Sequence, residues 1–182
     1  MKMNDIIKSD LYRYDRLTKV SKGKKKPGFR YMYYFRKATL HKKMSIYGIF
    51  YRLILRKLSY KYGFQIPVGT RIGEGFYIGH FGTIVINVES IIGKNCNIAH
   101  STTIGQVNRG KLKGCPVIGN YVWIGTGSVI VGKISIGNNV LIAPNSYVNF
   151  NVPDNSIVIG NPAKIIINEN ATSEYINNVR NP

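Results

Sequence analysis

Acidic residues, cysteines and long hydrophobic runs are all scarce in this sequence. Eight Asp and Glu stand against 26 Lys and Arg, so the formal net charge is +18. Cys96 and Cys115 form no CxxC pair, which argues against a disulfide scaffold and a zinc cluster and favours a reducing cytoplasm. The sequence contains no run of about 18 uncharged apolar residues, so it predicts no transmembrane helix. Residues 1–10 also lack the apolar core of a secretory signal.

The basic residues are concentrated at the start of the chain. Residues 1–65 hold 18 Lys and Arg against three Asp, together with 13 of the 21 aromatic residues. The remaining 117 residues hold eight basic and five acidic groups. This shift in composition predicts a basic, aromatic-rich helical segment at residues 1–64, followed by a domain of different character.

The front segment contains an interrupted helical pattern. Residues 22–28, KGKKKPG, predict an exposed loop because like charges repel and Pro and Gly break regular structure. Residues 31–62 lack Pro and predict two helical stretches that meet near residues 41–45. An apolar stripe at helical spacing follows in the second stretch: Ile46, Ile49, Phe50, Leu53 and Ile54.

Three roles for this segment stay open. It packs as a cap on the end of the following domain, or it docks through residues 1–65 on an anionic membrane surface at the inner face of the membrane. Nucleic-acid binding is the third role that the charge allows. We do not expect it, because no groove-reading motif is present and the rest of the chain is nearly neutral.

A six-residue aliphatic repeat dominates the rest of the chain. It runs through Ile66, Ile72, Ile78 and Ile84, then Ile86, Ile92, Ile98 and Ile104, and then Ile118, Ile124, Ile130, Ile136, Ile142 and Val148. Neither a helix, with a period of 3.6, nor an amphipathic strand, with a period of 2, gives this spacing. A fixed hexad predicts a mainly β fold, a parallel β-helix in which three hexads form one triangular turn. Small residues two places earlier would fit the tapering interior: Cys96, Thr102, Ser128 and Ser146.

The repeat slips at two places. Two extra residues lie between Ile78 and Ile86, and a filled prism wall can accommodate them only as an outward bulge, where His80 stands. The step from Ile104 to Ile118 is fourteen residues instead of six, which predicts a projecting loop at 105–117. Loops on a rigid scaffold commonly carry function, so both slips are candidate sites.

These segments resemble the left-handed β-helix, hexapeptide-repeat O-acetyltransferases, including serine acetyltransferases and the enzymes of bacterial polysaccharide synthesis. Residues 75–86, GFYIGHFGTIVI, match the segment that carries the catalytic histidine of the family, and residues 160–164, GNPAK, match its closing signature. The resemblance implies a β-helix domain at 65–167, a tail at 168–182, and His80 as general base. An imidazole near neutral pKa can accept the proton of an attacking alcohol.

His100 is a second histidine of interest. Its separation of 20 residues from His80 equals one 18-residue turn plus the two-residue bulge, so both should share a face on adjacent turns. Residues 100–105 also resemble the histidine segment of sugar N-acetyltransferases. His100 is therefore a competing base or a group that binds acceptor or oxyanion; Asn87 is a further secondary candidate.

The charged residues that would hold serine are missing at the expected positions. The aspartate before the catalytic histidine is replaced by Gly79, and an Arg-His pair by Gly114 and Cys115. The carboxylate that orients the base corresponds to Gln65. Without these residues, the ammonium and carboxylate groups of serine would lack charged partners in the site. The departures therefore favour, as acceptor, a sugar hydroxyl of a surface polysaccharide or its precursor. Serine O-acetylation for cysteine biosynthesis and a non-catalytic scaffold are the alternatives.

The resemblance also implies a co-substrate and an assembly. Acetyl-CoA would lie along a groove between neighbouring prisms, and the candidate contacts are Trp123, Gly125, Ala143 and Lys164, with Lys164 near a phosphate. Trp123 alternatively packs at a subunit interface. A homotrimer is expected, because the family site forms between two prisms. No metal site is expected.

Overall fold

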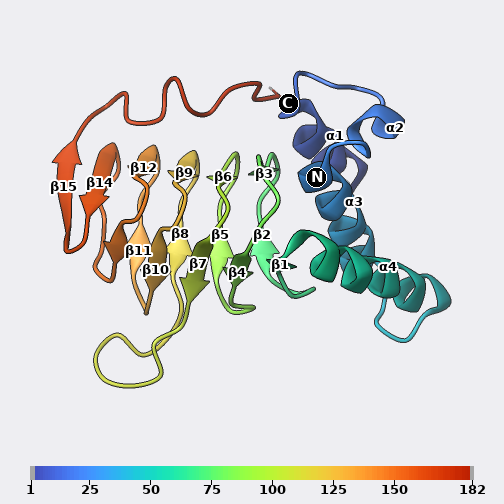
Figure 1. Ribbon diagram of the computed structural model, residues 1–182, viewed down its shortest axis with the longest axis horizontal. Helices are drawn as coiled ribbons and strands as arrows, with labels where there is room; N and C mark the ends of the chain where they lie inside the picture. The colour runs from blue at the N-terminus through green and yellow to red at the C-terminus, as the bar shows by residue number, and fades with distance from the viewer. Residues whose placement is uncertain (1–2, 181–182) are drawn as a thin grey trace.

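The computed structural model describes residues 3–180, so residues 1–2 of the front segment and 181–182 of the tail lie outside it. Four helices precede fifteen short strands (Figure 1). The helices are α1 (Met3–Tyr12), α2 (Val20–Gly23), α3 (Pro27–Leu40) and α4 (Ile46–Tyr62). The strands are β1 (Phe64–Gln65), β2 (Arg71–Ile72), β3 (Tyr77–Ile78), β4 (Ile84–Ile86), β5 (Ile91–Ile92), β6 (Asn97–Ile98), β7 (Thr102–Gly105), β8 (Val117–Ile118), β9 (Val122–Ile124), β10 (Val129–Val131), β11 (Ser135–Ile136), β12 (Val140–Ile142), β13 (Tyr147–Val148), β14 (Ser156–Gly160) and β15 (Ala163–Ile167).

The strands form three sheets, which are the walls of a triangular prism. Face A contains β1-β4-β7-β10-β13, face B contains β2-β5-β8-β11, and face C contains β3-β6-β9-β12-β14-β15. The chain visits the faces in the order A, B, C, and each strand pairs in parallel with the strand one turn later; β15 alone is antiparallel, to β14. The predicted mainly β, parallel β-helix with N-terminal helices is confirmed.

One aliphatic side chain from each hexad fills the prism. All fourteen predicted inward positions are buried, and Ile78, Ile98 and Ile124 stack in register along face C. The predicted small residues before them are buried as well: Cys96, Thr102, Ser128 and Ser146. Full burial of one Ile side chain contributes about 1.5–3 kcal/mol, so this column supplies much of the stability of the domain.

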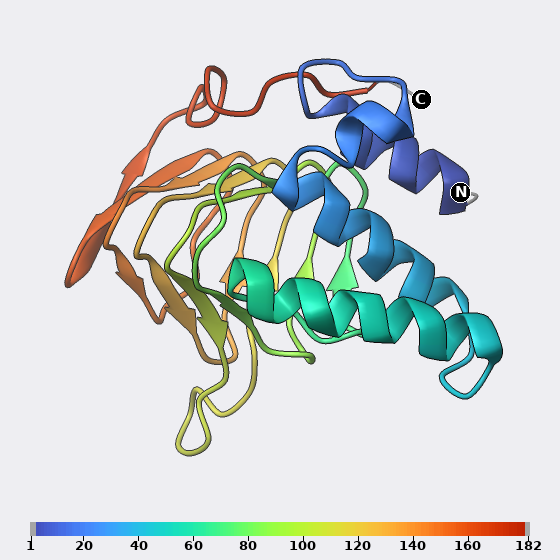
Figure 2. The ribbon, with the colours of Figure 1, turned by 45° about the vertical axis from the view of Figure 1, so that its right-hand side comes forward.

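The helices cover the open end of the prism (Figure 2). Buried Arg36, on α3, donates to the carbonyl oxygens of Ile72 (2.6 Å) and Gly73 (2.5 Å) and pairs with Asp10 at 2.9 Å. Asp10 in turn accepts from the backbone N–H of Phe76 at 3.0 Å. Burial raises the pKa of Asp10 although Arg36 opposes the shift. Arg36 and Asp10 therefore form hydrogen bonds with backbone groups of the first turn, which has no earlier turn to pair with.

Two tyrosines complete this cap. The hydroxyl of Tyr14 donates to the Ile78 carbonyl oxygen at 3.0 Å and lies 3.2 Å from the Ile78 backbone N–H. The hydroxyl of Tyr31 donates to the Ile66 carbonyl oxygen at 3.1 Å. Aromatic rings from the front segment thus contribute hydrogen bonds as well as apolar area to the prism end.

The C-terminal tail runs back along the outside of face C, from β15 to the N-terminal helices (Figure 1). Asn139 donates to the Glu169 carbonyl oxygen at 2.6 Å, and Asn97 donates to that of Tyr175 at 3.0 Å. Arg13 at the end of α1 donates to the Asn177 carbonyl oxygen at 2.8 Å. The tail therefore joins the two ends of the molecule.

The helical predictions for the front segment are accurate only in part. The two expected stretches correspond to α3 and α4, which are separated by residues 41–45. Helix α1 has no counterpart in the sequence-based expectation, and Val20–Gly23 forms a short helix where part of a loop was expected. Among residues 3–180, no helix combines the length and hydrophobicity needed to cross a bilayer.

Candidate active site

His80 lies where the chain passes from face C to face A, which we term the C–A edge. The connection from β3 to β4 contains residues 79–83, whereas the equivalent connection one turn later, from β6 to β7, contains only 99–101. The two extra residues leave His80 and Phe81 exposed. An accessible imidazole at a local widening of the scaffold can reach a bound hydroxyl group.

The segment that carries His80 is supported from two sides. The backbone N–H groups of Gly82 and Ile84 donate to the carbonyl oxygens of Tyr62 (2.9 Å) and Gly63 (3.0 Å) at the end of α4. Gly82 has φ of +137°, and a Cβ placed there would stand 3.0 Å from the Cβ of His100. Glycine is therefore required both by the backbone conformation and by the close approach of His100.

His80 and His100 occupy adjacent turns of the same edge, as the 20-residue separation predicts. Their ring centroids lie 5.9 Å apart with an interplanar angle of 84°. The Nδ1 atom of His100 is buried and, within the described structure, has no hydrogen-bond partner. A buried polar atom of this kind is costly unless a ligand or a neighbouring group meets it, so this edge is a candidate site.

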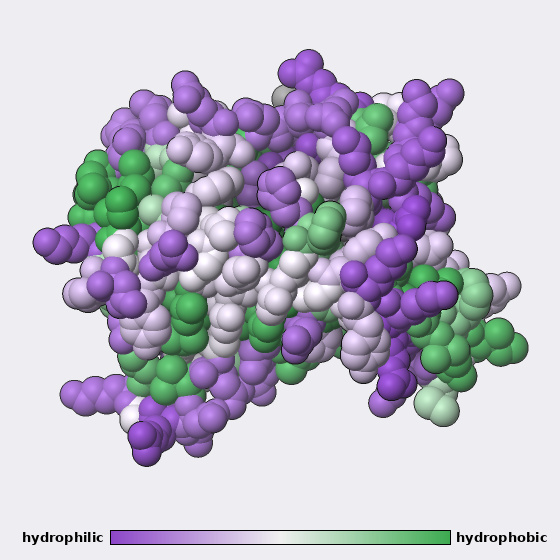
Figure 3. Space-filling view, in the orientation of Figure 1, coloured by the Kyte–Doolittle hydropathy of each residue, from purple (hydrophilic) through white to green (hydrophobic). Residues whose placement is uncertain are grey.

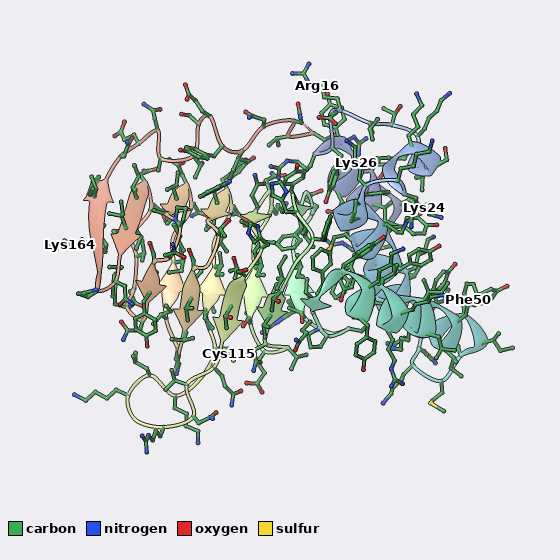
Figure 4. All side chains as sticks on the ribbon, viewed as in Figure 1. Arg16, Lys24, Lys26, Phe50, Cys115 and Lys164 are labelled. Carbon is green, nitrogen blue, oxygen red and sulfur yellow. The ribbon has the colours of Figure 1, made fainter. Side chains whose placement is uncertain are left out.

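Small residues extend the C–A edge away from His80. The positions after the face C strands are Gly79, Ala99, Gly125 and Ala143, and backbone N–H groups of the last three donate to the next turn (2.8–3.0 Å). Lys164 is exposed on β15 opposite Ile159, the next position in this series (Figure 4). Four turns separate this position from His80, about 19 Å at ~4.8 Å per turn.

The other predicted site residues lie elsewhere. Gln65 is exposed on face A and lines a 570 Å³ cavity beside α4. Trp123 lies on face C, where its ring packs against that of Tyr175 in the tail, 4.9 Å between centroids. The structure thus brings together His80, His100 and the small residues of one edge, but not Gln65 or Trp123.

Asn87 and Cys115 lie at the edge between faces A and B, termed the A–B edge. Asn87 accepts from the backbone N–H of Glu89 at 2.9 Å and donates to Gln106 at 3.1 Å. The Cys115 sulfur lies 4.0 Å from a carboxylate oxygen of Glu89. Burial first, and then the negative charge of Glu89, raise the pKa of the Cys115 thiol.

The projecting loop leaves the prism at the same A–B edge (Figures 1 and 4). Val107 and Gly114 pair as an antiparallel bridge with two 3.0 Å hydrogen bonds at its base. Its exposed cations are Arg109, Lys111 and Lys113. Because β4 separates the two edges along the chain, the loop and His80 occupy different corners of one prism.

The comparisons with known proteins assign this architecture. A family model described as bacterial transferase hexapeptide (six repeats) matches residues 115–149. A serine acetyltransferase of Helicobacter pylori is 32% identical over 140 residues, which is 77% of this chain and 81% of the relative. The chain belongs to the serine acetyltransferase family. The expected left-handed β-helix and the acetyl-CoA-dependent acyltransferase class are thereby confirmed.

Plant and bacterial relatives agree with this assignment. Serine acetyltransferase 2 of Arabidopsis thaliana is 36% identical over 110 residues, 60% of this chain, and the chain spans only 34% of that relative. The crystal structure of Neisseria gonorrhoeae serine acetyltransferase in complex with serine has a TM-score of 0.74 and 28% identity, covering 90% of this chain and 69% of the other. The Brucella abortus enzyme in complex with coenzyme A has a TM-score of 0.75 and 27% identity, covering 91% and 68%.

The expected polysaccharide acceptor is wrong. These relatives are serine acetyltransferases, and none of the reported matches acts on a polysaccharide by name, so the serine alternative is the better supported one. The expectation of a sugar acceptor rested on the absence of charge at Gly79, Gln65 and residues 114–115. Glu89, which the sequence reasoning missed, lies beside Cys115, and its one sequence signal was an acidic residue in a nearly neutral domain.

Proposed function

We propose that this protein transfers the acetyl group of acetyl-CoA to the hydroxyl group of serine, with His80 as general base. Membership of the serine acetyltransferase family supports the reaction class. The observation that carries the assignment of His80 is its exposed position on the two-residue widening of the C–A edge, 5.9 Å from His100.

The chemistry needs one proton acceptor and no covalent enzyme intermediate. The imidazole of His80 takes the hydroxyl proton of serine as its oxygen attacks the thioester carbonyl carbon. The tetrahedral intermediate collapses, the C–S bond breaks, and the CoA thiolate leaves with the proton returned from the imidazolium. The products are O-acetylserine and CoA. His100, whose Nδ1 has no hydrogen-bond partner among residues 3–180, is the candidate for the group that orients His80 or the acceptor.

Acetyl-CoA would lie along the C–A edge. The residues Gly79, Ala99, Gly125 and Ala143 are small, and of these Gly79 is exposed and Ala99 half-buried, so no bulky side chain from these positions would block a pantetheine arm along the edge. Lys164 stands on β15, five strand spacings from β3 or about 24 Å at ~4.8 Å per spacing, and would meet a phosphate at the far end. Trp123 would not contact CoA in this arrangement, because Tyr175 and the tail cover it.

The acceptor site would need two copies of the chain. His80 and the projecting loop lie at different corners of one prism, so they meet only where the C–A edge of one copy lies beside the A–B edge of the next. Three such contacts close a homotrimer by ordinary cyclic symmetry. In that assembly, Glu89 would hold the serine ammonium group and a cation of the loop its carboxylate, replacing the missing groups at Gly79 and residues 114–115.

Thiol release tests the reaction directly. Purified protein with acetyl-CoA should release CoA only when serine is added, and His80→Ala should lower kcat by about 10²–10⁴-fold. His41→Ala, which removes the histidine between α3 and α4, is the matched control and should retain full activity. Turnover by His80→Ala within tenfold of the parent would refute the assignment of the base. Absence of heat on acetyl-CoA titration would refute the enzyme itself.

The acceptor contacts have a separate test. Glu89→Gln should raise KM for serine by about tenfold or more and leave KM for acetyl-CoA unchanged. Glu174→Gln in the exposed tail is the control. An unchanged KM for serine in Glu89→Gln would remove Glu89 from the site without affecting the assignment of His80.

A further inference from the structure

Helix α4 presents a hydrophobic stripe to solvent. Ile46, Phe50 and Leu53 are 85%, 53% and 61% exposed, and Ile49 lies between them at 44%. Their spacing of three and four residues places them on one side of the helix. Figure 3 shows these hydrophobic side chains gathered at the end of the molecule formed by α4, and Figure 4 shows Phe50 there. Contiguous exposed apolar surface of this kind commonly marks an interaction site.

The fold holds this stripe in place. The opposite side of α4 contributes Leu55, Leu58 and Tyr62 to the core, so α4 has an inner and an outer apolar face. Ser45 caps the helix by accepting from the Gly48 backbone N–H at 3.1 Å. Arg52 donates to the Ala38 carbonyl oxygen at 2.9 Å and ties α4 to the end of α3. The outer face is therefore ordered before any partner arrives.

Positive charge surrounds the stripe without any acidic residue. Residues 16–73 contain 16 Lys and Arg and not one Asp or Glu. Lys42 and Lys43 precede the stripe, and Arg56, Lys57 and Lys61 continue the same exposed side of α4. A second copy of the chain, itself carrying +18, would bring like charges together on this face. The hydrophobic stripe and the surrounding cations together fit a partner with a negatively charged surface and an apolar interior.

We infer that the outer face of α4 docks on an anionic lipid bilayer. The hydrophobic stripe enters the boundary between headgroups and acyl chains, and the neighbouring Lys and Arg contact the lipid phosphates. The docking helix is joined to the candidate active site, because its last residue accepts a hydrogen bond from Gly82, two residues after His80. Bilayer association therefore holds the C–A edge near the membrane surface. The inference does not depend on the acceptor.

Vesicle co-sedimentation of the full chain tests this inference. Binding to vesicles of phosphatidylcholine with about a third phosphatidylglycerol should exceed binding to pure phosphatidylcholine by at least about tenfold and should fall at high salt. Phe50→Ser with Leu53→Ser should lower the partition coefficient at least about tenfold. Ile166→Ser with Ile167→Ser, two exposed residues at the opposite end, is the matched control and should change nothing.

Charge reversal gives an independent measurement. Lys42→Glu with Lys43→Glu replaces two exposed cations by anions and should weaken binding by about fivefold or more for each cation lost. Circular dichroism would confirm that each variant keeps its fold. Equal binding to neutral and anionic vesicles would overturn the proposal. So would unchanged binding of the Phe50 and Leu53 variant, or a loss of self-association in that variant during sedimentation without any change in vesicle binding.

Discussion

Gly82→Ala should separate the positioning of the two histidines from the stability of the fold. At φ of +137°, a residue with a Cβ costs about 1–3 kcal/mol of backbone strain. The added Cβ would also stand 3.0 Å from the Cβ of His100, some tenths of an ångström inside ordinary contact. The segment carrying His80 must therefore shift against His100, and displacements of this order in an active site lower turnover about tenfold or more.

Gly69→Ala is a matched control for this substitution. Gly69 has φ of +123°, close to that of Gly82, but a Cβ there would meet only Val88, at an ordinary 3.5 Å. Thermal unfolding should show a similar loss for both variants, about 2–4 °C per kcal/mol for a chain of this size. Only Gly82→Ala should lower kcat in the thiol-release assay. Wild-type kcat in Gly82→Ala at the expected loss of stability would refute the argument that this contact positions His80.

Three further predictions concern the cap, the A–B edge and the core. Asp10→Asn leaves Arg36 buried without its anion and should lower the free energy of unfolding by about 3–5 kcal/mol, measured by urea titration; a change below 1 kcal/mol would show the pair to be dispensable. Alkylation of Cys115 should reach half-maximal rate at a higher pH than a free thiol, since burial and Glu89 raise its pKa, and Glu89→Gln should move that midpoint down; an unmoved midpoint excludes the electrostatic contribution. Ile124→Ala should cost about 2–5 kcal/mol by the same titration, and a near-neutral result would mean that the prism interior repacks freely.

The β-helix could be predicted from the sequence because its determinant is local and repeated. One inward side chain recurs every six residues, so Ile78, Ile98 and Ile124 reveal the turn without any knowledge of contacts between distant segments. The widening at His80 was predictable for the same reason, as a departure from a regular count. Three asparagines adopt positive φ, a conformation that Asn tolerates better than most residues: Asn95, Asn139 and Asn145.

A cap formed by the front segment was one of the expected roles, but the contacts of the cap and of the tail could not be predicted, because they are polar and follow no period. Arg13 donates to the Gly75 carbonyl oxygen at 2.6 Å, and Arg36 donates to carbonyl oxygens of the same first turn of the prism. No sequence spacing encodes these contacts. Helix α4 shows the limit of periodicity itself. It has two apolar faces, and the pattern alone does not distinguish Ile46, which is exposed, from Leu55, which is buried.

The acceptor was mispredicted for a different physical reason. Absence of charge at Gly79 and residues 114–115 excludes one arrangement of serine-binding residues, but it does not exclude serine as the substrate. A carboxylate from a different edge, such as Glu89, can supply the same charge once copies of the chain lie side by side. Which edges meet is a property of assembly, and a single chain's sequence pattern carries no direct record of it.

The tail sets a limit on how this protein can grow. Repeat proteins commonly gain or lose units because each unit contacts only its neighbours. Here the tail accepts hydrogen bonds from Asn139, Asn97 and Arg13 in turn, so its length must match the length of the prism. Duplicating a turn between these anchors would separate them by about 4.8 Å, more than the ~3.3 Å that one extended residue spans. A longer relative that keeps these three hydrogen bonds must therefore have lengthened its C-terminal tail by one or two residues for every turn it gained.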